Sequence, residues 1–129
     1  MSFIEQRLVL TGQVAEGLAY WKQALLKAPD NLHVLNDMAW VLATSRDASL
    51  RNGVEALPLA EHAVHLTSEH EPAVLGTLAA VFAETGRFDE AIQLEQRATE
   101  LARQQGNTAL ADNLNARLAL YQGKTPVRQ

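Results

Sequence analysis

The chain has 129 residues, a formal net charge of −4 at pH 7 and no cysteine. The absence of cysteine excludes disulfides, thiolate metal sites and cysteine nucleophiles. The negative charge and the scattered lysines and arginines argue against nucleic acid as the main ligand, because binding a phosphate backbone requires a clustered basic surface. Apolar residues make up 47% of the sequence, which is enough for one domain with its own core.

The first residues, MSFIEQRLVLTG, contain Glu5 and Arg7 and lack the basic start and apolar run of a signal peptide. No stretch approaches the ~20 apolar residues that are needed to span a bilayer. We therefore expect a cytoplasmic protein without membrane contact, unless the chain is a fragment of a larger protein whose targeting segment lies elsewhere.

Alanine and leucine are abundant, whereas β-branched and aromatic residues are few, and this composition favours helices over sheets. We expect an all-α fold in which residues 1–129 form a single domain. Its first part, residues 2–29, is predicted to be a shortened helical hairpin, with a short helix over 2–11 and a second over 13–29. Gly12 separates the two, and Pro29 ends the second.

The short first helix would leave apolar side chains incompletely covered at this end of the domain. A second copy of the chain, or an upstream repeat, would then cover them. The residues of this expected self-association edge are Phe3, Ile4, Leu8, Tyr20 and Trp21.

Residues 31–67 are predicted to form a second hairpin, with Asp30 or Asn31 capping its first helix. Ala56 and Ala63 recur 35 residues later as Ala91 and Ala98, whereas Ala39 recurs only after 40 residues, as Ala79. The difference predicts a loop insert between the two helices, which we place at residues 45–53.

Residues 72–104 read as a complete helix, tight turn and helix. Pro72 suits a first helical turn, and Gly86 suits the left-handed conformation that ends a helix. Asp89 and Glu90 lie where acidic side chains stabilise the start of the second helix. A helix over 107–122 then caps the last apolar face, Gly123 ends it, and residues 123–129 form a short basic tail. Seven helices are expected in all.

The spacing in residues 72–104 resembles a tetratricopeptide repeat, a 34-residue helical hairpin. Glu95 and Arg103 depart from the family pattern, which has an aromatic residue and a proline at these places. The resemblance implies antiparallel hairpins stacked as a short right-handed solenoid with a C-terminal capping helix, and Arg117–Pro126 looks like the end of such an array in larger bacterial proteins. The residues that carry the resemblance to this repeat are Leu75, Leu78, Ala79, Phe82, Gly86, Phe88, Ala91 and Ala98.

In this family the first helix of each repeat lines a concave groove that binds ligands. The resemblance therefore implies a non-catalytic scaffold that binds a peptide or a helix of a protein partner. The alternative is a homodimeric structural domain that associates through the edge defined above. The implied groove residues are His33, Asn36, Asp37, Trp40, Thr44, Ala73, Gly76, Thr77, Ala80 and Glu84.

Other kinds of site receive little support. The groove positions supply no lysine or arginine, and Asp37 and Glu84 would repel a peptide carboxylate. His62, His65 and His70 are weak candidates for a metal, because no third ligand is fixed by a helix. The chain has no nucleophile motif and no phosphate-binding glycine loop, so we expect neither an enzyme nor a cofactor.

Overall fold

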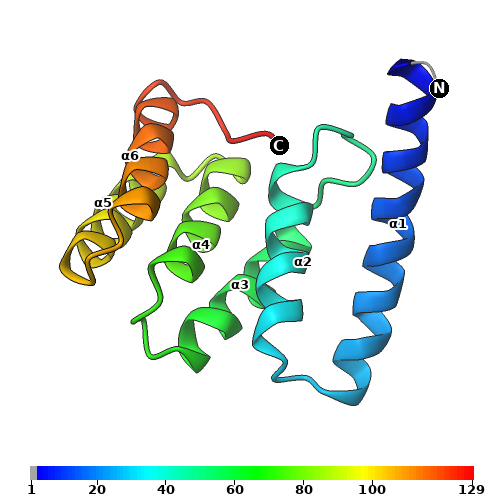
Figure 1. Ribbon diagram of the computed structural model, residues 1–129, viewed down its shortest axis with the longest axis horizontal. Coiled ribbons are helices and arrows are strands. Elements are labelled where there is room, and N and C mark those ends of the chain that lie inside the picture. The colour runs from blue at the N-terminus through cyan, green and yellow to red at the C-terminus, as the bar shows by residue number, and fades with distance from the viewer. Residues whose placement is uncertain (1–2) are drawn as a thin grey trace.

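The computed structural model describes residues 3–129, and describes side chains from residue 12 onward. This part of the chain contains six helices and no strand, which confirms the all-α prediction (Figure 1). None of these helices combines the length and the apolar run that crossing a membrane requires. The helices are α1 (Phe3–Lys27), α2 (Leu32–Thr44), α3 (Gly53–Leu66), α4 (Pro72–Glu84), α5 (Phe88–Gln104) and α6 (Thr108–Gln122).

The N-terminal hairpin predicted for residues 2–29 is wrong. A single helix of 25 residues, α1, runs straight through Gly12. Glycine in a helix interior costs only about 1 kcal/mol relative to alanine. A turn at this place would instead leave several backbone groups without their helical hydrogen bonds. The number of helices in the described chain is therefore six and not seven.

The other helices lie where the sequence predicted them, and their ends follow from local chemistry. Asn31, Asn52 and Asn107 each accept a hydrogen bond from the backbone N–H three residues later, at the starts of α2, α3 and α6. Gly86 and Gly106 follow α4 and α5 with φ of 81° and 76°, the left-handed conformation that glycine adopts without strain. The prediction for Gly86 is thus confirmed.

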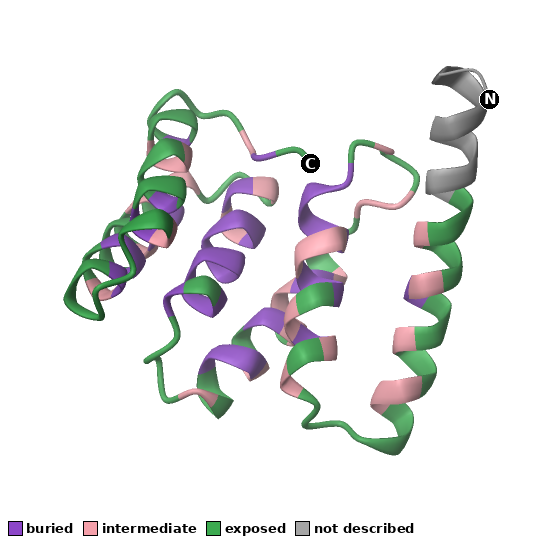
Figure 2. Cartoon of the chain, viewed as in Figure 1, coloured by how far each residue is buried: buried purple, intermediate pink, exposed green. Residues whose placement is uncertain are grey.

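Each helix packs against its neighbours in the sequence, and α2 also contacts α4, which in turn contacts α6. Helices α2, α4 and α6 therefore form one row, with α4 at its centre. Ten of the 13 residues of α4 are buried, more than in any other described helix (Figure 2). Gly76 allows a close approach of α6 to α4, since a Cβ at this residue would lie 2.7 Å from Leu114 Cδ2 of α6.

The loop between α2 and α3, residues 45–52, holds the predicted insert. Its path is fixed by hydrogen bonds: Asn52 N donates to the Leu42 carbonyl at 2.8 Å, and Arg51 Nη1 donates to the Ser45 carbonyl at 2.8 Å. Asp47 accepts from the backbone and the hydroxyl of Ser49. This insert lies at the C-terminal end of α2, next to the last residues of the chain (Figure 1).

Candidate functional site

The row of α2, α4 and α6 carries all of the residues predicted to line a groove, but they differ widely in exposure. At the N-terminal ends of α2 and α4, His33, Asp37 and Ala73 are exposed. Asn36, Trp40 and Glu84 are half-buried, and Gly76, Thr77, Thr44 and Ala80 are buried. The row therefore has an open end and a covered end.

The covered end lies beneath the C-terminal segment, which we define as residues 123–129. This segment leaves α6, passes the C-terminal end of α4 and reaches that of α2 (Figure 1). Gln129 N donates to the Thr44 carbonyl at 2.8 Å, and its side-chain amide donates to the Thr44 hydroxyl at 3.2 Å. The segment is thus bound to α2 through both backbone and side-chain hydrogen bonds.

Val127 anchors the segment in the core. Its side chain is only 8% exposed and belongs to an apolar cluster with Ala79 and Ala83 of α4. Ala91 of α5 and Tyr121 of α6 complete the buried part of this cluster, and Trp40 lies at its border. Three alanines leave space for one small branched side chain between the helices.

Arg128, the next residue, forms an ion pair at the end of α4. Its Nη1 lies 2.6 Å from Glu84 Oε2, and Arg51 Nε lies 3.4 Å from the other carboxylate oxygen of Glu84. The side chain of Glu84 is 17% exposed, so these charges interact with less solvent screening than a surface pair. Glu84 therefore joins the insert loop, α4 and the C-terminal segment.

Trp40, one of the implied groove residues, is half-buried and contacts a side chain of α6. The guanidinium of Arg117, from α6, lies 4.6 Å from the centre of its ring, in a cation–π contact. Arg117 can cross α4 because Gly76 has no side chain, and its Nη1 lies 3.5 Å from the position that a Cβ would take there. Arg117 thus bridges α6 to α2.

Beneath this bridge lies a buried carboxylate. Glu95 of α5 is fully buried, and among the described residues neither of its oxygens has a hydrogen-bond partner. Burial raises the pKa of Glu95 to about 7, although the positive charge of Arg117 acts to lower it. Burial likewise raises the pKa of Tyr121, and the nearby Glu95 carboxylate adds to that rise.

The candidate metal ligands are not brought together. His62 Nε2 lies 2.7 Å from Asp30 Oδ1, in the turn before α2, whereas His65 and His70 are exposed. In the part of the chain that the structure describes, no three histidine, aspartate or glutamate side chains are grouped so that they could hold a metal ion.

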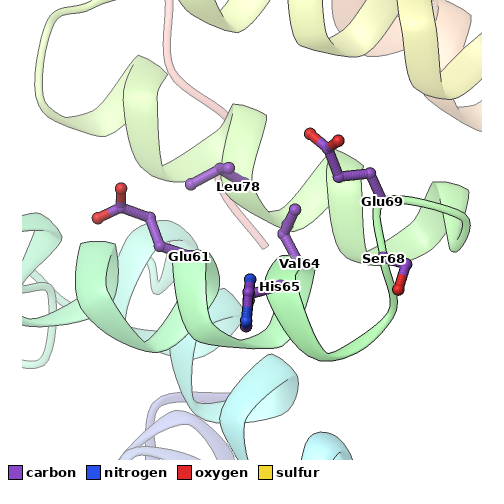
Figure 3. A pocket seen from close by; sticks show the side chains of 6 residues that line it. All are labelled: Glu61, Val64, His65, Ser68, Glu69 and Leu78. Carbon is purple, nitrogen blue, oxygen red and sulfur yellow. The ribbon is translucent and has the colours of Figure 1, made fainter.

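His65 instead lines a surface pocket of about 440 Å³ between α3 and α4. In Figure 3, the apolar side chains of Val64 and Leu78 lie between the carboxylates of Glu61 and Glu69. Glu69 is already paired with Arg97 of α5 at 3.2 Å. The pocket is therefore shallow and acidic, without converging donors for a specific ligand.

The predicted self-association edge lies on α1, whose described part packs mainly against α2 and whose Lys22 forms an ion pair with Glu55 of α3 at 3.6 Å. Tyr20 is 73% exposed, whereas Trp21 is half-buried against the main core. The side chains of Phe3, Ile4 and Leu8 lie outside the described residues. Leu26, which the sequence analysis did not single out, is 83% exposed on the same helix.

Sequence reasoning missed the residues that cover the row: Arg117, Val127, Arg128 and Gln129. The signal that could have found Val127 is that it is the only branched aliphatic residue among residues 123–129. No protein-family model matches this chain, and neither a curated protein nor a solved structure matches it significantly.

Proposed function

We propose that this chain is a non-catalytic, tetratricopeptide-like module that binds an extended segment of another protein along the row of α2, α4 and α6. The contacts between alternate helices support a short stack of hairpins, since such contacts arise when equivalent helices of successive repeats lie side by side. The proposed stack is a right-handed solenoid that begins at α2 and ends with the capping helix α6.

One observation carries the proposal: the C-terminal segment already occupies the covered end of the row. It is held by an apolar anchor, Val127, by a backbone hydrogen bond to Thr44 and by an ion pair to Glu84. These are the kinds of contact by which proteins recognise extended peptides, in which the main chain gives affinity and pockets for side chains give specificity. The row thus has the chemistry of a peptide site, with the chain's own residues in it.

The test is to empty the site and offer it a peptide. Val127→Asp places a charge where an apolar side chain is buried, so it should release the segment without disturbing the helices. A labelled peptide, acetyl-KTPVRQ-amide, should then bind this variant and bind the unchanged protein much more weakly, as measured by fluorescence anisotropy. Gln122→Asp, at an exposed position just before the segment, is the matched control. Absence of peptide binding to a folded Val127→Asp variant would contradict the proposal.

A second candidate function is self-association through α1, favoured by the exposed side chains of Tyr20 and Leu26 on a helix whose described part packs mainly against α2. Sedimentation at tens of micromolar separates this candidate from the first. A monomer at that concentration would count against it, and a dimer that Tyr20→Glu converts to a monomer would support it.

A further inference from the structure

Among the ion pairs of the described residues, one joins the C-terminal segment to the helices, and its carboxylate is Glu84. It lies at the last residue of α4, and the Arg128 guanidinium donates to it over 2.6 Å, a short charge-assisted hydrogen bond. Val127, which directly precedes Arg128, is buried, and Pro126 before it is half-buried. The helices therefore contact two adjacent residues of the segment, a small apolar residue and then a basic one.

The residues around Val127 limit the size of the side chain that fits there. Ala79, Ala83 and Ala91 are at most 1% exposed, and Tyr121 closes the cluster from α6. A larger side chain than valine would have to displace these helices, since overpacking a close-packed core is destabilising. The basic position is limited by charge, because an acidic residue there would bring a second carboxylate against a half-buried Glu84.

We propose that Glu84 is the specificity-determining residue of the peptide site, and that the site selects partner segments in which a small apolar residue is followed by a basic residue. The chain's own Val127–Arg128 pair is then a resident competitor of the same chemistry. This inference rests on the proposed function, and it adds the class of ligand and the means by which binding is limited.

Tethering sets how strongly the resident pair competes. Val127 follows the last residue of α6, Gln122, by only five positions, and so short a link gives an effective concentration of the order of millimolar. A partner with the same two residues must therefore reach millimolar concentration, or make further contacts, to displace the segment. The exposed residues at the open end of the row, His33, Asp37 and Ala73, are where a longer partner can make such contacts.

The experiment compares two peptides on two variants. Acetyl-KTPVRQ-amide and acetyl-KTPVEQ-amide differ only in the charge at the position of Arg128. On Val127→Asp, the arginine peptide should bind at least about tenfold more tightly than the glutamate peptide, since a hydrogen bond to a charged group is worth about 1.5–3 kcal/mol and about 1.4 kcal/mol is a factor of ten. On Val127→Asp with Glu84→Gln, the ratio should fall to about one. Val127→Asp with Glu69→Gln, which removes a carboxylate from another ion pair, should keep the ratio of at least about tenfold.

Each outcome decides a different statement. Equal affinities of the two peptides for Val127→Asp would overturn the specificity inference and leave the peptide site standing. A ratio that survives Glu84→Gln would also overturn it, because another residue would then be selecting the charge. If neither peptide binds a folded variant, the proposed function fails and this inference fails with it.

A second measurement needs no substitution. In the unchanged protein, millimolar acetyl-KTPVRQ-amide should release the Gln129 backbone amide from Thr44, and its NMR signal should move toward that of a free segment. The glutamate peptide should leave the signal in place at the same concentration. A signal that both peptides move equally, or that neither moves, would contradict the proposed competition.

Discussion

The two ends of the helix array are closed in different ways. At one end, α6 contacts both α5 and α4, and its residues Ala111, Leu114 and Tyr121 are fully buried. At the other end, the described part of α1 packs mainly against α2 and reaches α3 through the ion pair of Lys22 with Glu55, and Leu18 is the only buried residue among residues 12–27. Tyr20 and Leu26 of α1 remain 73% and 83% exposed.

The difference shows that the length of a helix does not decide how firmly it is held. α1 is the longest helix, but it gains apolar burial from one neighbour, whereas α6 gains it from two helices and from the C-terminal segment. In the repeat stack that we propose, stability is approximately a sum of terms between neighbours. We therefore expect α1 to open locally at a lower free energy than the region of α4–α6.

The largest expected effect tests this contrast with one substitution at each end. Leu114→Ala removes a fully buried side chain that packs against Gly76, and should lower the free energy of unfolding by about 2–5 kcal/mol. Leu26→Ala removes an exposed side chain and should change it by less than about 0.5 kcal/mol. Urea denaturation measures both. A cost for Leu26→Ala that approaches the cost for Leu114→Ala would mean that α1 has a partner which covers its outer face.

The next largest effect is a pH dependence of the free energy of unfolding, which arises from Glu95 near α6. Burial raises the pKa of Glu95 from 4.5 to about 7, so the folded protein binds this proton more tightly than the unfolded chain does. The resulting stability is fully present below pH 4.5 and is lost as the pH rises through about 7. Glu95→Gln removes this titration. Relative to the unchanged protein, the variant should therefore gain about 2–3 kcal/mol in free energy of unfolding between pH 4.5 and pH 8.5.

The matched control for this effect is Glu100→Gln, which removes an exposed carboxylate from the same helix. It should change the free energy of unfolding by less than about 0.5 kcal/mol. If Glu95→Gln shows the same small change at both pH values, the buried carboxylate is paired in solution. Arg117 would be the partner, and it would then have turned away from Trp40.

The helices that the sequence predicted well have a local signal at their start, and two of them also have one at their end. Helices α2 to α6 begin at a capping asparagine, a proline or an acidic first turn, and α4 and α5 are followed by glycines in the left-handed conformation. Gly12 looked like the same signal, but its φ is not positive and no atom outside the helix comes near it. A glycine alone cannot distinguish a helix end from a tolerated helix interior, because the difference in free energy is small.

The candidate site could be predicted only in part, because two of its walls come from distant segments. Helices α2 and α4, which carry the residues expected in the groove, contact each other. Gln129, however, reaches Thr44 across 85 residues of sequence, and Arg117 reaches Trp40 across α4. No periodicity encodes such contacts. Glu95 was visible as a departure from the family pattern, but only its burial reveals a carboxylate without a partner.

The smallest expected effect concerns the turn that directs the C-terminal segment back over the row. Lys124, and not Gly123, takes the left-handed conformation there, with φ of 55°, and Thr125 N closes the turn on the Leu120 carbonyl at 2.8 Å. Lys124→Gly should relieve strain of about 1 kcal/mol, reduced by the greater freedom of glycine in the unfolded chain, so a net gain of about 0.5 kcal/mol is expected.

Gly106→Ala supplies the matched comparison with the opposite sign. Gly106 has φ of 76° and no atom within 4 Å of the position that a Cβ would take, so the substitution adds backbone strain without a collision and should cost about 1 kcal/mol. Thermal unfolding of both variants measures the pair. Because both turns belong to the α6 end, neither variant should alter hydrogen exchange in the described residues of α1, 12–27. A loss of stability in Lys124→Gly would instead mean that the lysine side chain contributes more to this turn than its strained backbone costs.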